Sequence, residues 1–215
     1  MDKAIIIGAG TYGQVYAEYI KDSGNYDLVG FLDDDLSKHN TVINGLPVLG
    51  GVTLLESLSN RESTSIFCPI GNNTIRINIL QHVKDLGYQT PSFIHSDVQI
   101  HHTVRLGNCV YILPSTSIMP LTTIEDYVMI SMGVNIAHHT RIGKGSFLSQ
   151  GVNVGASINI GEKSFLGIAS TIMTGIKNIG QNTLVGAGAV VIKDLPDNVV
   201  AAGVPAKIIR KNRHD

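Results

Sequence analysis

Two adjacent histidines, His138 and His139, stand in segment 136–141 and are the first candidates for chemistry. Such a residue can be an exposed polar corner, a metal ligand or a general base. A metal site needs about three converging ligands. However, Gly143 and Lys144 occupy the positions, about five residues downstream, where a second metal ligand would be expected to accompany His138. In addition, adjacent histidines on a strand face opposite ways. The pattern disfavours a metal site and leaves two interpretations, an exposed polar corner or a general base, because imidazole titrates near neutral pH and can accept a proton from an amine or hydroxyl.

A second candidate site is the glycine-rich segment 8–13, which has the form Gly-x-Gly-x-x-Gly. It follows the apolar run 4–7 and precedes segment 14–23, which can form a helix, and three acids lie at 33–35. Glycines permit a tight turn and close backbone approach, and the following helix N-terminus attracts phosphate. The simplest alternative is a tight strand-to-helix turn without a ligand.

If a nucleotide binds there, the size of the domain favours a mononucleotide diphosphate over NAD. Segment 1–90 offers three or four strands, which is half of a full dinucleotide fold, and a ribose needs only one carboxylate. We expect phosphates, for example of a nucleotide-sugar, on the amides of Gly10, Thr11 and Tyr12. Asp33 or Asp34 would then accept hydrogen bonds from the base or ribose.

A six-residue repeat positions the two histidines. Branched aliphatic residues recur at every sixth position, and the position four residues further on is always β-branched or serine. A period of six fits neither a helix nor simple strand alternation, but it fits a solenoid of short strands whose aliphatic side chains stack inward. At three hexads per turn the repeat gives roughly five coils, and one extra residue near Asn178 shifts its frame. The aliphatic positions are Ile94, Ile100, Leu106, Ile112, Ile118, Ile124, Ile130, Ile136, Ile142, Leu148, Val154, Ile160, Leu166 and Ile172.

The predicted fold is therefore an α/β Rossmann-like half-domain followed by an all-β left-handed parallel β-helix. We expect strands at 4–7, 28–32 and 66–70 and helices at 14–23 and 74–86, an alternation typical of a small parallel α/β domain. The predicted divisions are 1–90 for the nucleotide-binding domain, 91–195 for the β-helix and 196–215 for a C-terminal tail.

Composition narrows the classes of partner. The 215 residues carry 16 Lys and Arg against 17 Asp and Glu, a balance that favours neither nucleic acid nor an anionic membrane. No apolar stretch is long enough to cross a bilayer, and the N-terminus lacks a signal peptide, so we expect a cytoplasmic protein. The two cysteines form neither a disulfide framework nor a zinc site.

Taken together, the motifs resemble the nucleotide-sugar acyltransferases of the hexapeptide-repeat superfamily. This group contains the sialic-acid O-acetyltransferases and the bacillosamine and perosamine N-acetyltransferases of bacterial glycan synthesis. The resemblance covers nearly the whole chain and rests on the order of these segments and the hexapeptide array: GAGTYG (8–13), FLDDD (31–35), GLPVLG (45–50), PIGNNTIR (69–76), AHHTRIG (137–143) and GVPAK (203–207).

The resemblance implies a homotrimer that binds acetyl-CoA between neighbouring β-helices and a nucleotide-sugar in the N-terminal domain, without a metal. The family's catalytic histidine precedes an Ile-Gly pair, here Ile142-Gly143, and corresponds to His138. Coenzyme-contacting positions correspond to Phe147, Ile168 and Gly186. Nucleotide-contacting positions correspond to Gly10, Thr11, Tyr12, Asp33 and Asp34, with Gly71 and Asn72 nearby.

The chain departs from the family pattern at three positions. His139 replaces an acid that usually follows the catalytic histidine, Phe147 replaces a second histidine, and Tyr12 replaces a histidine of the glycine loop. The leading hypothesis is direct acyl transfer from acetyl-CoA to a sugar amine or hydroxyl with His138 as general base. An NAD-dependent oxidoreductase and a non-catalytic protein that binds a sugar nucleotide are the alternatives.

Overall fold

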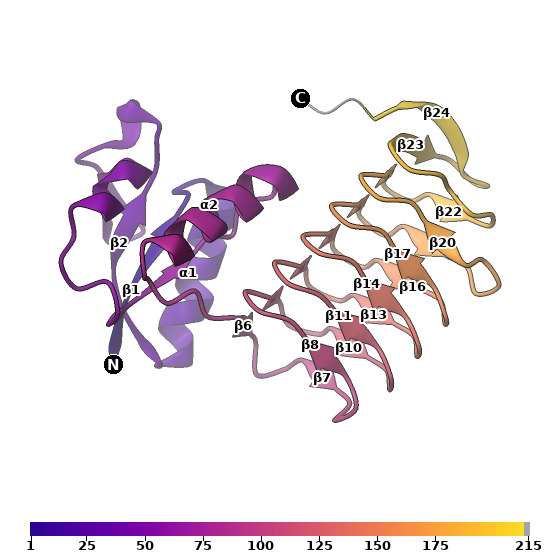
Figure 1. Cartoon of the computed structure of the whole chain (residues 1–215), viewed down its shortest axis with the longest axis horizontal. Coiled ribbons are helices and arrows are strands. Elements are labelled where there is room, and N and C mark those ends of the chain that lie inside the picture. The colour runs from indigo at the N-terminus through magenta and orange to yellow at the C-terminus, as the bar shows by residue number, and fades with distance from the viewer. Residues whose placement is uncertain (213–215) are drawn as a thin grey trace. The chain divides into compact units, whose positions relative to one another are not determined.

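The computed structural model describes residues 1–212, which form two compact units (Figure 1). The first unit is Met1–Phe93 and the second begins at Ile94. The predicted tail 196–215 is not separate, because two further strands at 199–202 and 207–211 extend a sheet of the second unit. Residues 213–215 of that predicted tail lie outside the described part of the chain. No helix within residues 1–212 has the length and apolar character needed to cross a bilayer.

The first unit contains a five-stranded sheet with the strand order β3-β4-β2-β1-β5. Its elements are β1 (Asp2–Ile7), α1 (Thr11–Ser23), β2 (Tyr26–Leu32), η1 (Leu36–Lys38), β3 (Val42–Ile43), β4 (Leu46–Gly50), η2 (Val52–Glu56), β5 (Thr64–Phe67) and α2 (Asn73–Asp85). Strand β1 pairs in parallel with β2 and β5, and β2 pairs in parallel with β4. The predicted α/β half-domain is therefore confirmed.

The β3–β4 hairpin was not predicted. Its strands are antiparallel and are joined by Asn44 and Gly45, which both have positive φ values of 48° and 75°. An Asn-Gly pair between short apolar segments is a strong sequence signal for a tight hairpin turn. The signal was therefore present, but the strands are only two and five residues long.

The second unit is a β-helix with three flat faces, and most of its strands contain two residues. Face A contains β7 (Gln99–Ile100), β10 (Ser117–Ile118), β13 (Asn135–Ile136), β16 (Asn153–Val154), β19 (Thr171–Ile172) and β22 (Val190–Val191). Face B contains β8 (Arg105–Leu106), β11 (Thr123–Ile124), β14 (Arg141–Ile142), β17 (Asn159–Ile160) and β20 (Asn178–Ile179). Face C contains β6 (Phe93–Ile94), β9 (Tyr111–Ile112), β12 (Met129–Ile130), β15 (Phe147–Leu148), β18 (Phe165–Leu166), β21 (Leu184–Val185), β23 (Val199–Ala202) and β24 (Lys207–Lys211).

The interior of the β-helix is the predicted aliphatic stack. Ile142, for example, is fully buried and lies in register between Ile124 and Ile160 of the neighbouring coils. Ile94 and Leu106 in the first coil are the exceptions, with exposed fractions of 39% and 38%. A terminal coil has a neighbouring coil on one side only, so its inward side chains are less completely covered.

The corners of the β-helix use left-handed backbone. From Cys109 to Gly175, one residue in every six has a positive φ, and most of these residues are not glycine. His139 is one of them, with φ of 58°. Residues other than glycine rarely adopt a positive φ unless the surrounding structure requires it. Here the hydrogen bonds between coils on both sides of each corner supply that requirement, for example Ser157 N–H to the carbonyl of His138.

Candidate active site

Three loops meet at the carboxyl end of the sheet in the first unit. The amide of Gly8, after β1, donates to the carbonyl of Leu32 at the end of β2. A Cβ atom on Gly8 would lie 3.3 Å from Ile70, which follows β5. Because parallel strands end at the same edge of a sheet, the loops after β1, β2 and β5 form one cluster, and this edge is where α/β sheets bind ligands.

The glycine loop opens α1 without a side-chain cap. Gly10 is the N-cap residue, and the first helical bond runs from Gln14 N–H to its carbonyl. The three preceding amides therefore take no part in the helical bonding and lie at the positive end of the helix dipole. Gly13 is required for packing, because its Cβ would lie 1.8 Å from the carbonyl oxygen of Gly8. A Cβ on Gly10 would meet no atom within 4 Å, so this glycine leaves open space at the helix N-terminus.

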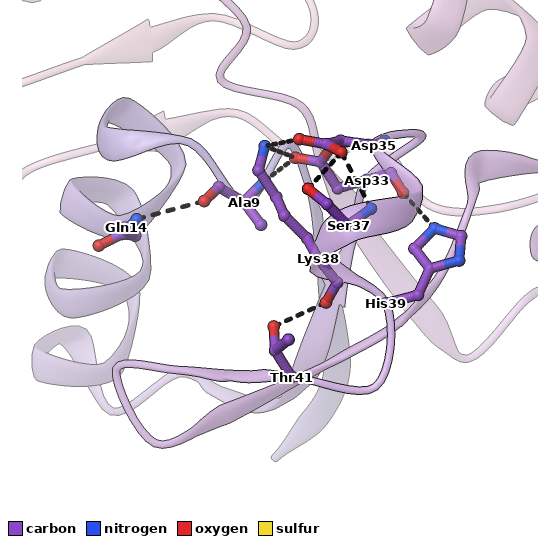
Figure 2. A network of polar contacts seen from close by, with 8 residues as sticks. All are labelled: Ala9, Gln14, Asp33, Asp35, Ser37, Lys38, His39 and Thr41. Carbon is purple, nitrogen blue, oxygen red and sulfur yellow. Dashed lines mark hydrogen bonds and ion pairs between the residues drawn. The ribbon is translucent and has the colours of Figure 1, made fainter.

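Asp33 ties the loop after β2 to the glycine loop (Figure 2). Its Oδ2 accepts from the Ala9 amide at 2.8 Å and from Nζ of Lys38 at 3.0 Å, and its Oδ1 accepts from the Asp35 amide at 3.0 Å. Burial alone would raise the pKa of Asp33, but these three hydrogen bonds together hold the pKa below its usual value. The carboxylate of Asp33 therefore braces the two loops. The sequence pattern did not predict this role or the part of Lys38 in it.

Asp34 is the more accessible of the two predicted carboxylates. It is exposed, and its Oδ1 accepts from the amide of Val52 at 2.8 Å. Within residues 1–212, its Oδ2 atom accepts no hydrogen bond. Asp34 can thus offer an oxygen to a ligand while the other oxygen fixes the side chain.

The loop after β5 is organised by Asn72 and a buried arginine. Asn72 is the N-cap of α2, and its Oδ1 accepts from the amide of Ile75 at 3.0 Å. Arg76 is fully buried, and its guanidinium donates to the carbonyl of Ile70 at 2.7 Å. Gly71, the other predicted residue here, is exposed between them. The N-cap role of Asn72 follows from its position before the helix and could have been predicted.

His138 and His139 occupy the corner between face A and face B, in the turn that joins β13 to β14. The expectation that they lie on a strand and face opposite ways is wrong. Their Nδ1 atoms are 3.0 Å apart, with the rings perpendicular, and both side chains are exposed. The positive φ of His139 causes this, because it bends the backbone between the two residues. Within residues 1–212, no group of three or more His, Cys, Asp or Glu is arranged to hold a metal ion.

The predicted coenzyme residues lie elsewhere on the β-helix. Phe147 lies in β15 on face C and packs edge-to-face on Phe165, with ring centroids 5.2 Å apart. Ile168 and Gly186 follow strands of face C, at the corner between face C and face A, and Ile168 is 53% exposed. His138 lies at a different corner. A single β-helix therefore does not bring the predicted base and the predicted coenzyme residues to the same edge.

Comparisons with known proteins agree with this architecture. The PglD N-terminal domain family matches residues 3–83. The acetyltransferase domain of PglB from Neisseria gonorrhoeae FA1090 is 28% identical, with a TM-score of 0.89 over 97% of this chain and 100% of that one. PerB from Caulobacter crescentus, solved with CoA and GDP-perosamine, is 31% identical, with a TM-score of 0.88 over 97% of both chains.

Shorter matches fall in part of the sequence only. The galactoside O-acetyltransferase of Escherichia coli K12 is 49% identical over 47 residues, which are 22% of this chain and 23% of that protein. The chain thus spans about a quarter of the length of the curated relatives it matches. PerB, in contrast, is similar along nearly all of both chains. From its fold and this similarity, the chain belongs to the nucleotide-sugar acyltransferase family of the hexapeptide-repeat superfamily, as its motifs predicted.

Proposed function

We propose that this protein transfers an acyl group, acetyl in the simplest case, from acyl-CoA to an amino or hydroxyl group of a nucleotide-linked sugar. The observation that carries the proposal is the similarity to PerB along 97% of both chains, since PerB was solved with CoA and GDP-perosamine. The PglB acetyltransferase domain was also solved with acetyl coenzyme A.

The glycine loop is proposed to hold the nucleotide. Its phosphates would lie against the amides of Thr11 and Tyr12, at the open space left by Gly10. Helix N-termini of this kind favour anions through both the N–H groups of the first turn, which make no hydrogen bond within the helix, and the dipole. Asp34 would accept a hydrogen bond from the ribose or base with its second oxygen, while Asp33 keeps the loops in place. Gly71 and Asn72 would line the same edge of the sheet.

His138 is proposed as the general base. Its imidazole accepts the proton of the attacking sugar amine or hydroxyl as the new bond to the thioester carbonyl carbon forms. The carbon–sulfur bond then breaks, and the proton passes to the leaving CoA thiolate. A backbone N–H of an adjoining coil would stabilise the oxyanion. Such general-base assistance contributes about 10²–10⁴-fold to rate. The perosamine N-acetyltransferase of Caulobacter crescentus was also solved with one histidine replaced by Ala or by Asn. These variants support the proposal that a histidine is functionally important.

A homotrimer would explain why the predicted coenzyme residues and the predicted base lie on different edges of the β-helix. Ile168 and Gly186 lie at the corner between faces C and A, whereas His138 lies at the corner between faces A and B. If the coenzyme binds between two β-helices, one subunit can supply Ile168 and Gly186, and the neighbouring subunit can supply His138. Phe147 on face C would then contact the coenzyme from the first subunit.

The test is a thiol-release assay with acetyl-CoA and a panel of amino-sugar and hydroxyl-sugar nucleotides. The His138→Ala variant should lose about 10²-fold or more in kcat while its thermal stabilisation by acetyl-CoA is retained. His102→Ala is the matched control, because His102 is an exposed corner residue of the same β-helix, 36 positions earlier. Unchanged turnover in His138→Ala would refute the role of the histidine. Stabilisation by NAD, with no thiol release from acetyl-CoA, would favour an oxidoreductase instead.

A further inference from the structure

The geometry points to His139 as the positioning residue of the active site, which holds the imidazole of His138 in the one tautomer that can act as a base. This inference rests on the proposed function. It concerns a position at which the chain differs from its family, where an acid usually follows the catalytic histidine. Its basis is the 3.0 Å approach of the two Nδ1 atoms.

One hydrogen atom joins the two Nδ1 atoms, so one ring is the donor and the other is the acceptor. If His138 donates, its Nδ1 carries the hydrogen and its Nε2 has a free lone pair that can accept a proton from the sugar. If His139 donates, the Nε2 atom of His138 carries the hydrogen and cannot act as a base. The reaction therefore needs His139 in the acceptor role.

The backbone fixes this pair from both sides. The amide of His139 donates to the carbonyl of Pro120 on one neighbouring coil, at 3.2 Å. The carbonyl of His138 accepts from the amide of Ser157 on the other neighbouring coil, at 3.0 Å. At this left-handed corner, where φ of His139 is 58°, the two ring centroids lie 5.1 Å apart. The contact is thus built into the corner, although both rings are exposed.

No other titratable side chain competes for this contact among the adjacent corner positions. The flanking coils place Pro120 on one side and Ala156 and Ser157 on the other. Arg141 is the nearest charged residue in sequence, and its guanidinium is held by Glu125 and by Oδ1 of Asn159. His139 is therefore the partner that decides the tautomer of His138.

A neutral imidazole and a carboxylate perform this task differently. Both can accept the hydrogen bond from Nδ1 of His138, but only a carboxylate adds a negative charge that stabilises the protonated ring. The contact breaks only when both rings are protonated, because each Nδ1 atom then carries a hydrogen. The wild-type enzyme should therefore remain active at a lower pH than a variant with an acid at this position.

The test compares three substitutions that the corner can accommodate. Ala169 and Lys163 occupy the same left-handed position at other corners of the β-helix, with φ values of 54° and 56°, so alanine and long side chains are compatible with this backbone. His139→Ala removes the acceptor, His139→Asn restores an acceptor oxygen without a charge, and His139→Glu supplies the acid. Partners that fix a histidine tautomer are worth about 10–100-fold at metal sites, and in the serine-protease triad about 10⁴-fold.

We expect His139→Ala to lower kcat about tenfold or more, with KM for both substrates changed less than about twofold. His139→Asn should recover most of that loss. His139→Glu should be active but should move the acid limb of the kcat–pH profile to higher pH. Equal kcat in the wild type and His139→Ala, with the same pH profile, would overturn the inference. If the wild-type protein releases no thiol with any sugar nucleotide, the proposed function fails instead, so the two failures are distinguishable.

Discussion

Replacement of Ile142 by alanine tests the stacked core on which the whole β-helix depends. Ile142 is fully buried between Ile124 and Ile160 of the neighbouring coils. The change removes three carbon atoms, and at about 0.8 kcal/mol per buried carbon the transfer loss alone is about 2.4 kcal/mol. Because the coils above and below are tied by hydrogen bonds, the cavity can collapse only in part. We therefore expect a total loss of about 3–4 kcal/mol.

Leu106→Ala is the matched control on the same face of the β-helix. Leu106 is 38% exposed in the first coil, so its side chain has lost less contact with water and leaves no enclosed cavity. The expected loss is about 1–2 kcal/mol. The assay is guanidinium unfolding followed by far-UV circular dichroism, since the chain contains no tryptophan. Protein concentration must be held equal, because a trimer would couple stability to concentration. Equal midpoint shifts for Ile142→Ala and Leu106→Ala would refute the inward stacking.

Three further predictions concern single contacts. Gly13→Ala should lower the melting temperature and abolish nucleotide-dependent thermal shift, because its Cβ would lie 1.8 Å from the carbonyl of Gly8; a normal shift would contradict this. Asp33→Asn should be less stable than the wild type at neutral pH. The lowered pKa of Asp33 stabilises the fold above its unfolded value of about 3.9, and this advantage is lost as the pH falls through the folded value, so the two stability curves should converge at acid pH. Ser164→Ala should lower the free energy of unfolding by about 1 kcal/mol, because it removes the hydrogen bond from Ser164 Oγ to the carbonyl of Gly180. Ser170→Ala should leave the free energy of unfolding nearly unchanged in the same denaturation assay, because the buried hydroxyl of Ser170 makes no hydrogen bond within residues 1–212.

The β-helix was predictable from the sequence because its constraint is strictly periodic. Each coil buries one aliphatic side chain per face against the same position of the next coil, so the pattern recurs every six residues and needs no distant partner to be recognised. The extra residue near Asn178 was also visible, and the structure places it before β20, where Asn159 pairs with Asn178 at a spacing of 19 instead of 18. The Gly-x-Gly-x-x-Gly segment likewise predicted a strand, a tight turn and a helix, because these depend on neighbours in the chain.

The arrangement of the site side chains was decided only by the tertiary structure. Asp33 was predicted to contact a nucleotide, yet its carboxylate is engaged by Ala9 and Lys38, which reach it from separate loops. His138 and His139 were expected to diverge, but the left-handed corner turns them toward each other. Sequence periodicity specifies which residues face inward. Backbone dihedrals at a corner, and contacts between loops distant in sequence, depend on how neighbouring coils and strands pack, and that information appears only when the chain is folded.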